Sequence, residues 1–216
     1  MRPWHPVTML STPMRYGLAL LGPVALAVAG ATHPARFTAE SASWWHDLHV
    51  ILLPLFGLLA LTVWMVLGPV WTGVDGWLAT AARILALVYA AFYGALDVLA
   101  GIAAGALAEY QESTGNEIGR SVSVVFGQAS MLGAVGTWSL LAAFGLVGVV
   151  LFRRTGVRSL PGTVVALVAS WSFMSSHVYP PWGVVTMLAF GAAAVLLLRA
   201  ETYAHPFTRR RVVVKT

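Results

Sequence analysis

Asp97 is the residue in this sequence whose position most strongly suggests chemistry, because it is an acidic side chain inside a long apolar stretch. An aspartate near the centre of a membrane helix costs roughly 2.5–3.5 kcal/mol on insertion scales, so it usually has a function or a specific partner. Helical spacing places Asp97 on a face of small residues, with Tyr93 one turn before it. Since small residues let helices approach closely, we expect Asp97 to point into a bundle, where Tyr93 can hydrogen-bond to it.

Three histidines form a second group of candidate residues. His46 and His49 have the three-residue spacing that places two imidazoles on nearly the same helix face, a spacing that metal sites use. His177 closes the fifth apolar stretch, and Gln128 lies near the start of the fourth. If the chain alternates across a membrane, these residues and Asp97 fall near one boundary. The sequence therefore predicts a polar pocket for a small ligand, ion or proton, formed by Asp97, Tyr93, His46, His49, Gln128 and His177.

Each of these residues also has an interpretation without function. Asp97 can be protonated, or hydrogen-bonded to Tyr93, Gln128 or a serine, and simply lock helices together, or it can lie at the interface. Histidines near a membrane boundary are satisfied by water and headgroups. If histidines from two helices instead bind a cofactor, haem b or a quinone is the candidate. We expect His33 in a loop, and His5 and His205 in the cytoplasm.

Several kinds of chemistry are excluded by residue usage. The chain has no cysteine, which excludes disulfides, thiolate nucleophiles and iron–sulfur clusters. Its single lysine, Lys215, lies in the tail, so a retinal Schiff base on a buried lysine is excluded. The serines before His177 lack a Gly-x-Ser-x-Gly elbow and are interpreted as packing residues. No catalytic residue is assigned, and the sequence favours a protein that is not an enzyme.

The composition is that of a protein that faces lipid. Hydrophobic residues make up 58% of the 216 residues and charged residues 10%, with a net charge of +5. A soluble domain carries about 25% charged residues. So few charges cannot cover a surface in water without large exposed apolar patches. The basic residues lie beside apolar stretches, where they mark the cytoplasmic side of a membrane, and we expect no nucleic-acid partner.

Six stretches reach or approach the length of about 20 apolar residues that a bilayer crossing needs. The chain is therefore predicted to be all-α, a single polytopic bundle of six transmembrane helices, with spans at about 16–31, 50–71, 78–108, 122–152, 161–178 and 182–198. The fourth is too long for one upright crossing, so we expect it to tilt or to begin at the interface. The first ends in a sequence, Ala29-Gly30-Ala31, that resembles a signal-peptide cleavage site, and cleavage would leave five helices.

The basic residues predict the orientation. With the N-terminus inside, eleven of the 13 Lys and Arg residues fall on the inner side, and Arg36 and Arg120 fall on the outer side. An excess of Lys and Arg marks the cytoplasmic side, so we expect a multi-pass protein of the cell membrane with both termini cytoplasmic. The tail, 199–216, carries a cluster that can bind anionic lipid headgroups: Arg209, Arg210, Arg211 and Lys215.

Two short patterns stand out in the predicted outer half: Tyr93-x-x-x-Asp97-x-x-x-Gly101-x-x-x-Gly105, and His177 followed by Pro181-Trp182-Gly183. Together they resemble small multi-span bacterial membrane proteins. The resemblance implies a helix bundle in the inner membrane and carries no activity. Three functions stay open: a transporter or sensor with a ligand or proton site, a non-catalytic subunit or scaffold that forms a homo-oligomer or joins a membrane complex, and a redox protein that binds haem b or a quinone.

Overall fold

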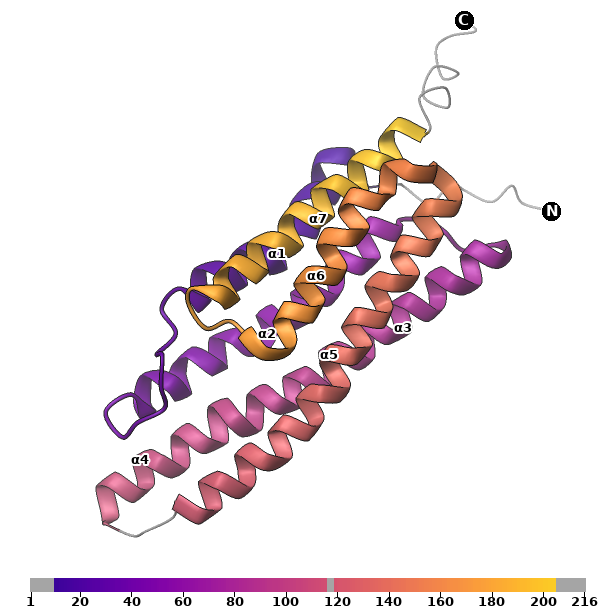
Figure 1. Cartoon of the computed structure of the whole chain (residues 1–216). Helices are drawn as coiled ribbons and strands as arrows, with labels where there is room; N and C mark the ends of the chain where they lie inside the picture. Colours follow the sequence, from indigo (N-terminus) through magenta and orange to yellow (C-terminus); the bar gives the residue numbers. More distant parts are fainter. Residues whose placement is uncertain (1–9, 116–118, 205–216) are drawn as a thin grey trace, which may run out of the picture.

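The computed structural model describes residues 10–115 and 119–204. Within these ranges the regular structure is helical, without strands, and the helices pack side by side into one bundle (Figure 1). The all-α bundle predicted from the sequence is thereby confirmed. The α-helices of the described part are α1 (Thr12–Gly30), α2 (Ala42–Leu67), α3 (Gly73–Leu96), α4 (Ala104–Thr114), α5 (Gly119–Thr155), α6 (Leu160–Ser176) and α7 (Trp182–Ala204).

Two short helices of other types join these elements. The π-helix η1 (Asp97–Ala103) lies between α3 and α4, so that Gly73–Thr114 is one continuous helical leg. The 3-10 helix η2 (Gly156–Ser159) lies between α5 and α6, where the chain reverses direction (Figure 1). The π-helix is a rare element, and such turns occur often at functional sites.

The described residues contain five helical stretches that are long and apolar enough to cross a membrane. One of them, Gly119–Ser176, holds α5, η2 and α6. Because α5 and α6 lie side by side in opposite directions, the five stretches make six helical legs (Figure 1). The count of five apolar stretches is close to the six helices predicted, and these stretches are compatible with an integral membrane protein.

Small residues allow the legs to approach one another closely. A Cβ on Gly22 of α1 would lie 2.5 Å from the Leu58 carbonyl carbon of α2, so α1 packs directly against the α2 backbone. The Thr62 hydroxyl of α2 donates to the Ala19 carbonyl of α1 over 2.9 Å. A Cβ on Gly136 of α5 would similarly lie 2.9 Å from the Tyr93 nitrogen. Close approach of this kind is how membrane helices associate without a hydrophobic driving force.

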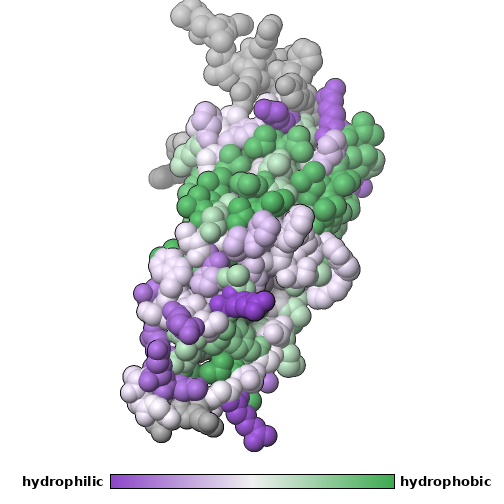
Figure 2. Space-filling view, turned by 60° about the vertical axis from the view of Figure 1, so that its left-hand side comes forward, coloured by the Kyte–Doolittle hydropathy of each residue, from purple (hydrophilic) through white to green (hydrophobic). Residues whose placement is uncertain are grey.

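The two ends of the bundle differ. The connections α2–α3 and α5–α6 lie at the same end as the start of α1 and the end of α7, whereas α1–α2 and α6–α7 lie toward the other end, where α4 and the start of α5 project past α6 (Figure 1). The leg Gly73–Thr114 has 42 residues. At 1.5 Å per residue it is about 63 Å long, well above the roughly 30 Å of a bilayer core. On the face that Figure 2 shows, apolar residues gather in the half nearer the end of α7, and the projecting half is more hydrophilic.

Candidate functional site

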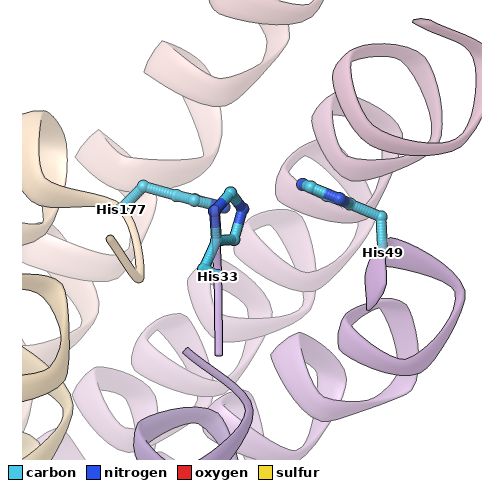
Figure 3. Close-up of side chains that lie close together, drawn as sticks. All are labelled: His33, His49 and His177. Atoms are coloured by element: carbon cyan, nitrogen blue, oxygen red, sulfur yellow. The ribbon is translucent and has the colours of Figure 1, made fainter. Parts of the chain in front are cut away.

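Three histidines meet toward the end of the bundle opposite the termini. His33, His49 and His177 each place one ring nitrogen within 4.8 Å of the nitrogens of the other two. The three side chains come from different segments and point toward one another, with the His33 ring drawn between the other two (Figure 3). His33 and His49 are buried, and His177 is half-buried. We call these three residues the histidine cluster.

His33 reaches the cluster because the chain after α1 folds back over the bundle. Its backbone N–H donates to the Gly30 carbonyl over 3.0 Å, which continues the end of α1 as a turn. A Cβ on Gly30 would lie 2.6 Å from the Val178 carbonyl oxygen, so the end of α1 is close to the α6–α7 connection. His33 lies in a loop, as the sequence predicts, but the residue is only 4% exposed.

His49 enters the cluster from α2. A Cβ on Gly101 of η1 would overlap the His49 imidazole, so the absence of a side chain at Gly101 provides the space for this ring. The Trp45 ring lies against His49 with 5.0 Å between the ring centroids, and its indole N–H donates to the Ala100 carbonyl over 2.9 Å. The π-helix and the first turns of α2 thus position the His49 ring.

His177 enters the cluster from the end of α6. Its φ of 46° lies in the left-handed region, which is uncommon for a residue other than glycine. This conformation ends α6, and the ring contacts the aromatic rings of Tyr93 and Phe56 at centroid distances of 5.7 and 5.4 Å. Strained backbone of this kind occurs most often at functional sites.

In each ring of the histidine cluster, Nδ1 already has a partner. The His33 Nδ1 lies 2.8 Å from the Pro34 carbonyl oxygen, and the His49 Nδ1 lies 2.6 Å from the Trp45 carbonyl oxygen. A carbonyl oxygen only accepts, so both Nδ1 atoms carry the proton and donate it. The His177 Nδ1 is hydrogen-bonded to the Tyr93 hydroxyl. The nitrogen left free on each ring is therefore Nε2, which is the arrangement of histidine metal ligands with their outer partners.

Asp97 lies beside the cluster as the first residue of the π-helix. It is fully buried, and its Oδ1 is 4.0 Å from the His49 Nε2. Among the described residues, neither of its carboxylate oxygens has a hydrogen-bond partner. The expected Tyr93–Asp97 bond is not present, because the Tyr93 hydroxyl bonds to His177 instead. A buried carboxylate without a partner is costly, so its place beside the cluster calls for a compensating positive charge or donor.

The structure brings together four of the six residues that the sequence predicts: Asp97, Tyr93, His49 and His177. His46 lies outside the cluster, where its ring contacts the Asp47 carboxylate over 3.0 Å on the partly exposed side of α2. Gln128 lies on an exposed face of α5 and does not line the cavity described below. His33 takes the third position instead. The sequence could have suggested His33, because this histidine lies close to the same predicted membrane boundary as His49.

A cavity of about 330 Å³ adjoins the cluster between α2, α3, α5 and α6. One part of its wall is polar and includes His49, His177 and the Tyr93 side chain. The remaining wall is mainly apolar and includes Leu96, Phe126, Trp138, Phe173 and Met174. This volume is within the range of small-ligand pockets, which is about 300–1,000 Å³.

Comparisons of the chain with known protein families, with curated proteins and with solved structures find no match. The site is therefore interpreted from its own chemistry. Burial lowers the pKa of His33, so this ring is neutral at pH 7 and its Nε2 lone pair is free. Three imidazoles whose ring nitrogens lie this close together form a typical site for zinc and similar transition-metal ions.

Proposed function

We propose that the protein is an integral membrane protein that binds a divalent transition-metal ion through Nε2 of His33, His49 and His177. The observation that carries this proposal is the convergence of the three ring nitrogens within 4.8 Å. Metal–nitrogen bonds of about 2.0–2.1 Å place the nitrogens of a tetrahedral site about 3.4 Å apart. Metal binding therefore requires the three nitrogens, which lie within 4.8 Å of one another, to approach by up to about 1.4 Å.

Two features near the rings support a metal ion over a merely structural cluster. Each Nδ1 is held by a carbonyl oxygen or a hydroxyl, which fixes how each ring is aimed. The Asp97 carboxyl group lies 4.0 Å from the His49 Nε2 and has no hydrogen-bond partner among the described residues. A bound cation compensates this carboxylate, whereas neutral histidines alone do not.

The geometry favours a single metal ion over haem b. A porphyrin held axially by His49 and His177 would occupy the plane midway between their rings, whose centroids are 6.2 Å apart. The His33 ring centroid is 5.1 Å from that of His49 and 5.8 Å from that of His177, so it lies close to this plane. A porphyrin extends on every side of its iron and would collide with His33. Purified protein is accordingly expected to show no Soret absorption.

We place the metal site on the outer side of the cell membrane. The excess of Lys and Arg predicts that the end with both termini faces the cytoplasm, and the histidine cluster lies toward the opposite end. The tail residues that we propose to contact anionic lipid lie outside the described residues: Arg209, Arg210, Arg211 and Lys215. An outward metal site suits a metal-dependent receptor, sensor or enzyme of the membrane.

Metal content of the purified protein tests the proposal. The full chain is purified in detergent with a tag that contains no histidine, loaded with Zn²⁺ and analysed by mass spectrometry of the metal. We expect about one zinc ion per chain. The variants His33→Ala, His49→Ala and His177→Ala should each lower zinc affinity by at least about 100-fold, because each removes a direct ligand.

His46→Ala is the matched control, since His46 lies on the same helix as His49 but outside the cluster. This variant should bind zinc as the natural sequence does. Thermal unfolding in detergent checks that each variant is folded. Equal zinc content in the natural protein and in a folded variant that lacks all three histidines would contradict the proposal, and a stoichiometric protein partner would then favour a scaffold.

A further inference from the structure

The cavity beside the histidine cluster opens along one side of α5. Ser130, Ala134 and Trp138 are spaced by four residues, so they form one stripe on this helix. All three line the cavity, and all three are exposed. A side chain that lines a cavity and is also exposed lies at its mouth. The mouth therefore runs along this stripe.

The surface beside this mouth is apolar and aromatic around Trp138. Trp138 is 55% exposed and makes an edge contact with Trp171 of α6, with 6.1 Å between the ring centroids. Trp171 is itself 63% exposed, and Met131 and Val135 beside the stripe are also exposed. In a membrane protein a surface of this kind faces lipid. The mouth consequently opens sideways toward lipid, and a molecule with an apolar chain can enter from there.

The cavity adjoins the proposed metal site. Three protein ligands leave the fourth position of a tetrahedral metal ion for water or substrate. Two of these ligands, His49 and His177, belong to the cavity wall. An oxygen at the fourth position would lie about 3.4 Å from the His49 Nε2. Asp97, with Oδ1 at 4.0 Å from the same nitrogen and no hydrogen-bond partner among the described residues, can accept a hydrogen bond from it.

We propose that this cavity binds an amphiphile, with an oxygen of its headgroup at the fourth position of the metal ion and its apolar chain along the α5 stripe. The proposal rests on the metal site of the proposed function. It adds the class of ligand, an acyl-chain compound with a metal-binding carbonyl or hydroxyl group. Asp97 acts as a positioning residue for the oxygen on the metal.

Cobalt-substituted protein tests this proposal directly. Co²⁺ replaces zinc and gives visible absorption bands that change when the fourth ligand changes. Acetohydroxamate and octanohydroxamate share one metal-binding head and differ in their apolar chain. We expect both compounds to change the cobalt spectrum of the natural protein when titrated in detergent.

The variant Ala134→Phe distinguishes binding of octanohydroxamate in the cavity from its partitioning into the detergent micelle. The new ring should fill the cavity mouth, so octanohydroxamate should bind at least about tenfold more weakly than to the natural protein, while acetohydroxamate and Co²⁺ bind as before. Val135→Phe is the matched control, because Val135 is 43% exposed, adjoins Ala134 and does not line the cavity. Partitioning of octanohydroxamate into micelles is the same for all these proteins.

The outcomes distinguish the two proposals. If the natural protein shows no cobalt bands, the metal-site proposal is wrong, and the amphiphile proposal, which depends on it, is wrong as well. If cobalt bands form but do not respond to hydroxamate, the amphiphile proposal alone is overturned. It is also overturned if Ala134→Phe weakens both hydroxamates equally or neither of them. Retained cobalt bands in Ala134→Phe show that this variant is folded.

Discussion

Asp97 and His46 show how the role of a residue depends on what surrounds it. Asp97 lies inside a long apolar stretch and His46 lies just before one, and both are predicted to belong to one pocket. In the structure Asp97 is fully buried beside the His49 Nε2, whereas the His46 ring is partly exposed and contacts Asp47. The histidine with a constrained role is instead His33, whose Nε2 is buried without a hydrogen-bond partner among the described residues. Burial without a partner is what makes these residues candidates for binding.

The charge of Asp97 gives a prediction at the residue scale. Asp97→Asn keeps the shape of the side chain and removes its negative charge, so the protein should still fold but should bind zinc about 10- to 100-fold more weakly. Competition with a chelator of known zinc affinity measures this change. Asp47→Asn is the control, because Asp47 contacts His46 outside the cluster and should leave zinc affinity unchanged. Unchanged zinc affinity in Asp97→Asn would show that Asp97 does not contribute to the metal site.

The π-helix is the element that brings α3 and α2 together at the site. It begins at Asp97 and contains Ala100, whose carbonyl accepts the Trp45 indole N–H. It also contains Gly101, which lies against the His49 ring. One irregular segment therefore positions a carboxylate, a hydrogen-bond acceptor and the space for a ligand. The sequence places Gly101 four residues after Asp97, but neither the π-helix nor the contact of Gly101 with His49 could be inferred from it.

Gly101→Ala tests this element. The added methyl group would overlap the His49 imidazole, so we expect the ring to shift and zinc affinity to fall by about tenfold or more. Overpacking of this kind also costs about 1–3 kcal/mol of stability. Gly127→Ala is the control, since a Cβ on Gly127 meets nothing within 4 Å. Zinc titration and thermal unfolding measure both effects, and equal behaviour of the two variants would show that Gly101 does not position His49.

At the scale of the whole molecule, an asymmetric bundle places its site toward one end. The start of α1, the end of α7 and the connections α2–α3 and α5–α6 lie together (Figure 1). The histidine cluster lies toward the other end, since its residues follow α1, begin α2 and end α6. The α1 helix is part of this arrangement, because it packs against α2 and its Arg15 guanidinium lies 2.7 Å from the Glu201 carboxylate of α7. The residues of the site come from both halves of the chain, so its geometry depends on the assembly of the complete bundle.

The orientation in the membrane can be measured because the chain has no cysteine. Ala35→Cys lies in the exposed α1–α2 connection, and Val157→Cys lies in η2, where Val157 is 70% exposed. With both termini cytoplasmic, a membrane-impermeant maleimide should label Ala35→Cys in intact spheroplasts and Val157→Cys only after lysis. The reverse pattern would place the histidine cluster on the cytoplasmic side.

The sequence by itself determined the helical class, the approximate apolar legs and the candidacy of Asp97, His49 and His177. Composition and helical periodicity are local properties, so they can be evaluated without knowing which helices are neighbours. The tertiary structure decided which side chains meet. Three residues along a helix leave a rotation of about 60° between two side chains, and that is enough to separate His46 from His49. The path of a loop added His33, and the rotation of α5 placed Gln128 outside, because convergence depends on how whole elements pack.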